Sequence, residues 1–195
     1  MFGIAQASWL NRAVVTLAYP DPELTDGRVR LRRWSLSDLA CIEAAATDHR
    51  IPEGTSVPAL FTAEEGTAFI HRQWSRIQDA VGVSQAVVDA GTDQAVGLAW
   101  LGLRPQPGVG GVGYWVIPPA RRRGYASGAV RLLSDWALSA LGFDRVEAWV
   151  EPDNVPSQGV LLSSGFEQEG LLRNFLRSNT APRDAFVFSR VTRRD

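Results

Sequence analysis

The chain has 195 residues, an apolar fraction of 45% and a formal charge of −1. This length suits a single domain with one sizeable core, and the composition excludes an intrinsically disordered chain. The small net charge excludes a global field that would attract nucleic acid or a membrane surface. The single cysteine, Cys41, excludes a disulfide framework and a cysteine-based metal site, so we expect a small core residue in a reducing cytosol.

The first 27 residues are the part that the sequence explains least. A short apolar run, Ala13 to Ala18, precedes Pro20-Asp21-Pro22 and the turn signal Asp26-Gly27. The run is too short to span a membrane, and no basic region precedes it as in a signal peptide. We predict an N-terminal extension over residues 1–27, which packs on the domain or on a partner subunit, and a domain over residues 28–195.

Residues 28–60 open the predicted domain. Apolar and polar residues alternate from Arg28 to Arg33, which predicts a first strand. Ser37 is a candidate N-cap for a helix that runs to about Thr47. We expect a loop from Asp48 to Leu60.

A second helix and a hairpin follow. The segment Thr62-Ala63-Glu64-Glu65 has the pattern of a capping box, and it opens a helix that continues through Trp74 and Ile77. The segments Gln85–Asp89 and Ala95–Leu103 then predict two strands joined around Gly91.

The run from Gly108 to Gly113 matches Gly-x-Gly-x-x-Gly, a dinucleotide-binding fingerprint that requires a helix directly afterwards. The next residues instead predict a strand, Tyr114 to Ile117, which Pro118 and Pro119 end. We therefore expect a flexible hairpin here, whose glycines permit a bulge or a splay of the sheet, and no nucleotide site.

A basic turn, Arg121-Arg122-Arg123-Gly124-Tyr125-Ala126, follows this strand. It opens a predicted amphipathic helix that Gly142 ends. One face of this helix is apolar and comprises Ala129, Leu132, Leu133, Trp136, Ala137, Ala140 and Leu141. The first amides of a helix lack intrahelical partners and lie at the positive end of its dipole, so the turn is a candidate phosphate site. The alternative is a solvated basic loop.

The predicted strand Arg145–Val150 places Glu147 and Glu151 on one sheet face. We expect both carboxylates to pair with arginines, with polarisation of an acceptor amine as the alternative. Asn154 then has the position of an N-cap for a helix that Gly165 ends.

The pattern Arg-x-x-Gly-x-Ala of Arg121–Ala126 resembles the acyl-CoA-binding motif of the GNAT acyltransferase superfamily. The ordered segments around it add to the resemblance, which extends from about Val29 to Val191 and is similar to the branch of the ribosomal-protein alanine N-acetyltransferases. These segments are Gly113–Val116, Arg145–Ala148, Pro152–Ser157, Ser164–Phe166, Glu169-Gly170 and Leu172-Arg173. The resemblance implies an α+β fold with three α/β/α layers and a mixed, mostly antiparallel, splayed central sheet.

The resemblance also implies acetyl-CoA as cofactor and a set of residues that bind it. The amides of Trp115 and Val116 would pair with the pantetheine arm, and those of Arg122 to Ser127 would bind the pyrophosphate. The expected cofactor-binding residues are Trp115, Val116, Arg121, Arg122, Arg123, Gly124, Tyr125, Ala126, Ser127, Asn154 and Ser157.

The implied reaction transfers an acetyl group to a primary amine, of a protein N-terminus or a small molecule, by direct attack in a ternary complex without a metal. Ser157 would protonate the leaving thiolate beside Asn154, and the amide of Val116 would stabilise the oxyanion. The family's carboxylate bases would fall near Gly110 and Leu176, where this chain has none.

The remaining candidates for the base are His49 and Glu53 in the loop after the first helix, with His71 farther away. The loops that would choose the acceptor are residues 48–60, 103–111 and 176–183. Because the expected carboxylates are missing, a CoA-binding regulatory module without turnover remains an alternative. A further alternative is an assembly domain that forms a homodimer.

Overall fold

Eight strands form one sheet in the computed structural model of the chain, which describes residues 17–177 and 181–192. The strands are β1 (Leu24–Thr25), β2 (Val29–Arg32), β3 (Gly82–Asp89), β4 (Ala95–Leu103), β5 (Val109–Val116), β6 (Arg145–Val150), β7 (Glu167–Arg177) and β8 (Pro182–Val191). Their order in the sheet is β1-β2-β3-β4-β5-β6-β8-β7. The pair β5 and β6 is parallel and the other neighbours are antiparallel, which confirms the predicted mixed, mostly antiparallel sheet.

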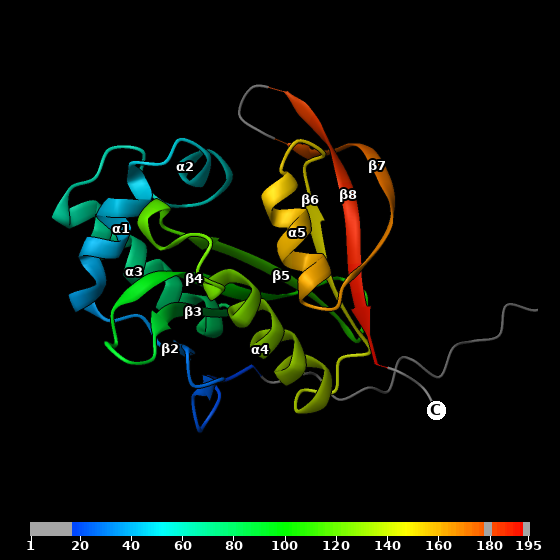
Figure 1. Cartoon of the computed structure of the whole chain (residues 1–195), viewed down its shortest axis with the longest axis horizontal. Coiled ribbons are helices and arrows are strands. Elements are labelled where there is room, and N and C mark those ends of the chain that lie inside the picture. Colours follow the sequence, from blue (N-terminus) through cyan, green and yellow to red (C-terminus); the bar gives the residue numbers. More distant parts are fainter. Residues whose placement is uncertain (1–16, 178–180, 193–195) are drawn as a thin grey trace, which may run out of the picture.

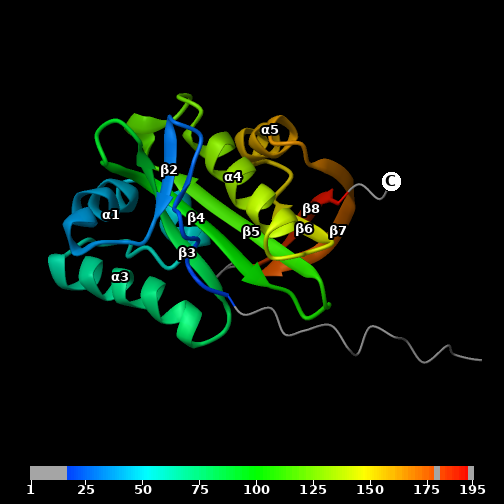
Figure 2. The ribbon, with the colours of Figure 1, turned by 90° about the horizontal axis from the view of Figure 1, so that it is seen from below.

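Helices cover both faces of this sheet, as the predicted three layers require (Figures 1 and 2). The helices are α1 (Leu39–Ala46), α2 (Arg50–Gly54), α3 (Ala63–Gln78), α4 (Tyr125–Ser139) and α5 (Val155–Ser163). Alternate side chains of the strands separate the core into two clusters: Val87 packs with α4 and α5, whereas Ala86 and Val88 pack with α1 and α3. Within the described residues, no helix is long and apolar enough to cross a membrane.

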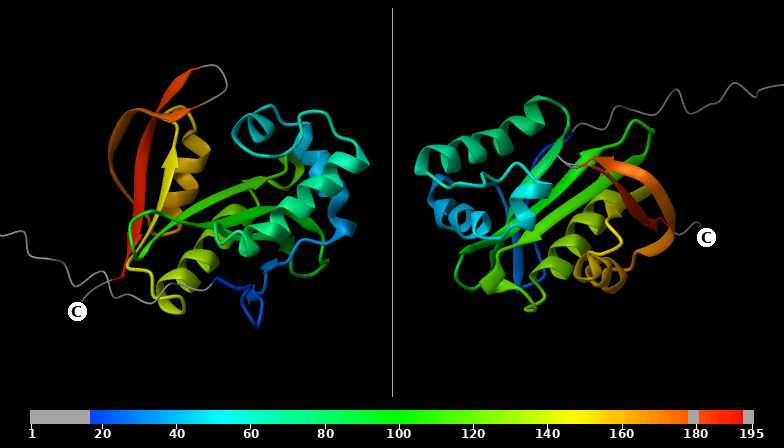
Figure 3. Two further views of the ribbon diagram at one scale, coloured as in Figure 1. Left: turned by 180° about the vertical axis from the view of Figure 1, so that it is seen from behind. Right: turned by 90° about the horizontal axis from the view of Figure 1, so that it is seen from above.

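The sheet splits between β5 and β6, and we call this split the fork. The two strands pair only where Val109–Gly111 lies beside Arg145–Glu147. Beyond that point β5 and β6 diverge, with β6 continuing beside β8 (Figure 3). The predicted splay is therefore confirmed, and α4 and α5 begin at the diverging ends.

The first helix begins differently from the prediction, because Ser35 and not Ser37 is the cap. The hydroxyl of Ser35 accepts the amide of Ser37, and the carboxylate of Asp38 accepts the amide of Ser35 at 2.8 Å. This reciprocal capping box starts a 3-10 turn, Leu36–Asp38, which leads into α1.

The predicted loop from Asp48 to Leu60 contains the short helix α2. The Asp48 carboxylate accepts the amides of Arg50 and Ile51 at 2.9 and 3.1 Å, and Ile51 is buried. These two hydrogen bonds and this apolar anchor stabilise a helix that is too short to form alone.

The glycine-rich hairpin is also more regular than predicted, because strand β5 begins at Val109 and includes these glycines. A Cβ atom on Gly111 would lie 2.5 Å from the Arg104 guanidinium, and one on Gly113 would lie 3.4 Å from Trp100. The glycines thus leave room for the side chains of Arg104 and Trp100 to lie against β5. The glycines continue into the rest of this strand and not into the helix that a dinucleotide-binding fingerprint would require.

Part of the predicted N-terminal extension packs on the domain. Strand β1 pairs with β2, and Leu17 is buried. The hydroxyl of Thr25 donates to the carbonyl of Val29 at 2.8 Å, which closes the turn between the two strands. Residues 1–16 of the extension lie outside the described residues, so its packing on a partner stays a prediction.

Candidate active site

The turn before α4 has the geometry of an anion site. Gly124 caps the helix with φ of 80°, and Arg122 also has a positive φ, of 57°. Within the described part of the chain, the amides of residues 122–127 donate to no protein acceptor. Several free amides at the positive end of a helix of this length favour a phosphate group.

Three arginines surround this turn without a carboxylate partner among the described residues. Arg122 and Arg123 belong to the predicted motif and are exposed, and the Arg123 guanidinium lies 5.5 Å from the centre of the Tyr125 ring. Arg28 directly precedes β2, and its Nη1 atom would lie 3.6 Å from a Cβ atom on Gly124. In the sequence, nothing local to the segment of Arg28 links this residue to the motif.

Arg121 has a different environment from its two neighbours. Its Nε atom donates to the carbonyl of Val116 at 3.0 Å, and its Nη2 atom donates to Asp48 at 2.7 Å. Partial burial alone would raise the pKa of Asp48, but the Arg121 hydrogen bond and two backbone amides lower it. Arg121 therefore ties the end of β5 to the start of α2, and its guanidinium is already engaged.

The edge of β5 at the fork presents the amide of Val116 and not that of Trp115. Gly97 lies opposite Val116, and the amide of Ile117 donates to the carbonyl of Val96 at 2.9 Å. Because hydrogen bonds alternate in an antiparallel ladder, the Trp115 amide faces β4 and the Val116 amide faces the fork. The prediction that both amides pair with a ligand is therefore corrected for Trp115. Its ring is buried in the core with α1 and α3.

Asn154 and Ser157 lie across the fork, at the start of α5. The Asn154 side chain accepts the amide of Ser157 at 3.3 Å, which confirms the predicted N-cap. The carbonyl of Ser157 accepts the hydroxyl of Tyr114 at 3.0 Å. The Ser157 hydroxyl has no hydrogen-bond partner in residues 17–177 and 181–192, so it is free for a ligand.

The two candidate bases lie on either side of the beginning of α2. His49 is exposed, directly after the Asp48 that binds Arg121. Glu53 forms an ion pair of 3.4 Å with Arg183 of β8, and Arg183 lies 3.6 Å from Glu151. The structure thus joins Glu53 and Glu151 through one guanidinium.

Glu147 and His71, the two other candidates from the sequence, make contacts of a structural kind. Glu147 lies 3.5 Å from Arg104 and 3.2 Å from Arg145, so its predicted pairing with arginines is confirmed. His71 lies 5.1 Å from Trp74, ring centre to ring centre, on α3, and no described contact connects it to the fork. The described residues contain no cluster of side chains suited to a metal ion.

The first turn of α4 is anchored to the turn between β3 and β4. The Tyr125 hydroxyl donates to Asp89, which also accepts the amides of Gly91 and Thr92 at 3.0 Å. The hydrogen bond between them raises the pKa of Tyr125 and lowers the pKa of Asp89. The phosphate turn therefore has a fixed support outside its own motif.

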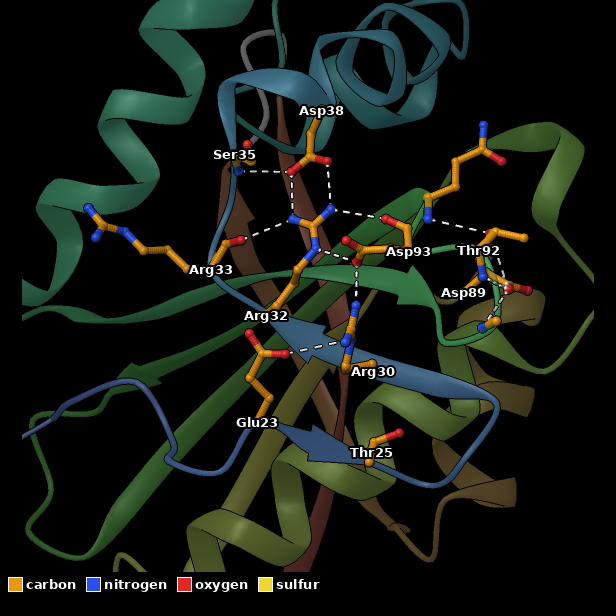
Figure 4. A network of polar contacts seen from close by, with 12 residues as sticks. Glu23, Thr25, Arg30, Arg32, Arg33, Ser35, Asp38, Asp89, Thr92 and Asp93 are labelled. Atoms are coloured by element: carbon orange, nitrogen blue, oxygen red, sulfur yellow. Dashed lines mark hydrogen bonds and ion pairs between the residues drawn. The ribbon is translucent and has the colours of Figure 1, made fainter.

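A second network supports the β3–β4 turn from its other side, as Figure 4 shows. The Arg32 guanidinium binds both oxygens of Asp38 at 2.8 Å and one oxygen of Asp93 at 2.8 Å. Hydrogen bonds to Asp38 are the main cause that raises the pKa of Arg32. Arg32 thus connects the start of α1 with the turn that carries Asp89.

Comparison with known proteins supplies the family. A family model described as an acetyltransferase (GNAT) domain matches residues 28–167. The uncharacterized N-acetyltransferase YoaA of Bacillus subtilis (strain 168) is 27% identical over 175 residues, which cover 89% of this chain and 99% of YoaA.

Two solved structures with the same fold are ribosomal-protein acetyltransferases or their relatives. Mycobacterium smegmatis RimJ in complex with CoA-disulfide has a TM-score of 0.73 and 23% identity, over 87% of this chain and 85% of that one. The ribosomal-protein-S5-alanine acetyltransferase of Vibrio fischeri has a TM-score of 0.70 and 23% identity, over 87% and 96% of the two chains.

Proposed function

The chain belongs to the GNAT family of acetyl-CoA-dependent N-acetyltransferases, and from this premise we propose that it acetylates a primary amine, of a peptide N-terminus or a small molecule, by direct attack in a ternary complex. The observation that carries the proposal is the fork itself. Among the described residues, the Val116 amide on β5 and the Ser157 hydroxyl on α5 have no hydrogen-bond partner, and they belong to the two elements that flank the place where the sheet opens.

The residues of the α4 turn fit the phosphate end of acetyl-CoA. We assign the pyrophosphate to the amides of residues 122–127, with the side chains of Arg122, Arg123 and Arg28 supplying positive charge. Arg121 takes no direct part in this assignment. It instead holds the Val116 carbonyl, so that the neighbouring amide keeps its direction.

The fork fits the pantetheine arm and the thioester. Among the described residues, strand β5 has no strand partner on its β6 side beyond Gly111, so its edge can pair with an extended ligand as an added strand would. We assign the oxyanion of the transition state to the Val116 amide. A preorganised donor of this kind contributes about 2.7–4 kcal/mol in acyl transfer.

Ser157 completes the chemistry on the other side of the fork. As the amine nitrogen bonds to the thioester carbon, the carbon–sulfur bond breaks and its electron pair stays on sulfur. The Ser157 hydroxyl then donates a proton to the thiolate and regains one from the ammonium that the attack produces, through water. Asn154 holds the first turn of α5 in place for this role.

The attacking amine must be neutral, and His49 and Glu53 are the residues that we propose for its deprotonation. Glu53 is engaged by Arg183, so it must exchange this ion pair for the amine. Replacing each residue by alanine tests its role, and unchanged turnover excludes that residue. An acceptor that enters as a neutral amine needs neither.

The acceptor loops of this proposal are residues 48–60, 103–111 and 176–183, of which residues 178–180 lie outside the described part of the chain. We also propose a cytoplasmic location, because the buried Cys41 suits a reducing compartment. A homodimer stays a prediction.

The test of the proposal is turnover with a panel of amines. The protein is incubated with acetyl-CoA and either short peptides with free N-termini or small primary amines, and the release of the CoA thiol is followed. Acceptor-dependent release supports the enzyme. Binding of acetyl-CoA without release for either class of amine contradicts it and favours a regulatory module.

A further inference from the structure

One hydrogen bond crosses the fork between the two elements that carry the proposed chemistry. Tyr114 lies on β5 beyond the last residue paired with β6, and its hydroxyl donates to the Ser157 carbonyl of α5 at 3.0 Å. Val116, the proposed oxyanion donor, follows two residues later on the same strand. The hydrogen bond therefore connects β5, which carries Val116, to Ser157.

Ser157 is held from two sides by this arrangement. Asn154 accepts its amide, and Tyr114 donates to its carbonyl. The Tyr114 ring is half-buried and packs on the core cluster shared by α4 and α5, so its position is fixed. Burial raises the pKa of Tyr114 to about 12, and the hydroxyl thus remains a donor at neutral pH.

Main-chain pairing cannot set the separation of the two groups at this level of the sheet. The register between β5 and β6 ends at Gly111 and Glu147, well before Val116. The distance from Val116 to Ser157 is therefore set by core packing and by side-chain contacts, and the Tyr114 hydrogen bond is one of these contacts. Acyl transfer is sensitive to this distance, because a misplacement of about 1 Å can cost roughly a hundredfold in rate.

We propose that Tyr114 is a positioning residue, which sets the Ser157 hydroxyl at the distance from the Val116 amide that acyl transfer requires. The inference rests on the proposed role of Ser157 as proton donor. Tyr114 itself touches neither the thioester nor the amine in this account. Its removal should therefore change the rate of the chemical step and leave the affinity for acetyl-CoA nearly unchanged.

The experiment is a double-mutant cycle between Tyr114→Phe and Ser157→Ala, measured as kcat and as KM for acetyl-CoA. Phenylalanine keeps the packing of the ring and removes the hydroxyl. We expect Tyr114→Phe to lower kcat about tenfold or more, with KM for acetyl-CoA within about threefold. In the Ser157→Ala background the same change should have little further effect, because the hydroxyl to be positioned is gone.

Tyr125→Phe is the matched control, because it removes the hydroxyl of another tyrosine that donates a hydrogen bond. This hydroxyl supports the phosphate turn, so its loss should raise KM for acetyl-CoA. The effect should be the same in the wild-type and Ser157→Ala backgrounds. Thermal unfolding without ligand verifies that each variant is folded.

The outcomes separate the inference from the proposed function. An unchanged kcat in Ser157→Ala contradicts the proton-donor role and the proposed chemistry. A lowered kcat in Ser157→Ala, combined with an equal factor for Tyr114→Phe in both backgrounds, contradicts only the positioning role. An unchanged kcat in folded Tyr114→Phe contradicts it as well.

Discussion

Gly124→Val is the substitution that isolates the geometry of the phosphate turn. Gly124 has φ of 80°, a conformation that side chains with a Cβ atom rarely adopt. Space is not the obstacle, because the nearest atom to an added Cβ, the Arg28 Nη1, lies 3.6 Å away. The substitution therefore acts on the backbone conformation and on the amides that depend on it.

The magnitude follows from the strain and from the hydrogen bonds. A left-handed backbone costs an L-residue roughly 1–2 kcal/mol, which valine can relieve only by rotating the turn. A rotated turn withdraws amides from the pyrophosphate, and a hydrogen bond to a charged group is worth about 1.5–3 kcal/mol. The loss of two such bonds weakens acetyl-CoA binding on the order of a hundredfold to ten-thousandfold.

Gly142→Val supplies the control at the other end of the same helix. Gly142 has φ of 69° and no atom of the described residues within 4 Å of an added Cβ, so the strain is comparable. Both variants should lose similar stability in thermal unfolding without ligand. Calorimetric titration with acetyl-CoA should show weakened binding for Gly124→Val only. An affinity of Gly124→Val within a few-fold of wild type would refute the assignment.

Three further predictions concern the free energy of unfolding. Arg32→Ala leaves the buried Asp38 carboxylate, which is 4% exposed, without a counter-ion. The free energy of unfolding in urea titrations should therefore fall by about 3 kcal/mol. A loss below about 1 kcal/mol would contradict this prediction. Gly97→Ala places a Cβ atom 2.2 Å from a carbonyl oxygen of the adjacent strand, and it should lower the free energy of unfolding by more than about 3 kcal/mol. Gly170→Ala, where the described residues leave open space, should change this free energy by less than about 0.5 kcal/mol. Equal losses would refute the packing argument. The hydrogen bond from Arg145 is the main cause that lowers the pKa of Glu169 to about 2, so Glu169 contributes stability above pH 4.5, its ordinary value, which is lost as the pH falls towards 2. Glu169→Gln should flatten the acid dependence of unfolding in that range, and an unchanged slope would argue against the contribution.

The sequence predicted best those features whose causes are local. The apolar stripe of α4 was sufficient for the helix, and three of its residues, Ala129, Leu133 and Ala137, are fully buried. The turn Arg121–Ala126 was predicted to open α4, and Asn154 was predicted as the N-cap of α5, because both signals lie within one turn of the helix start. The same locality explains the hairpin of β3 and β4.

Competing local patterns caused the errors in the predicted elements. Ser35 and Ser37 both have the chemistry of a cap, and Asp38 decides between them by accepting the amide of Ser35. Helix α2 was missed because its five residues are too few for a periodic pattern, and the Asp48 side chain stabilises it instead.

The contacts that complete the site join residues distant in sequence, and no local pattern contains them. Arg28 meets Gly124 only because β2 lies beside the start of α4. Tyr114 meets Ser157 only through the tertiary fold, which places the first turn of α5 within hydrogen-bond reach of β5. The correction for Trp115 has the same origin, since the direction of its amide depends on the register of β5 against β4.

Thermal unfolding with and without excess acetyl-CoA shows whether the α4 turn and the fork bind this molecule. A ligand at about 100 times its dissociation constant adds roughly 2.7 kcal/mol to the free energy of unfolding. We predict a clear rise in Tm for the wild-type chain and for Gly142→Val, and a much smaller rise for Gly124→Val. An unchanged Tm of the wild-type chain at millimolar acetyl-CoA would contradict the assignment of the α4 turn and the fork as the acetyl-CoA site.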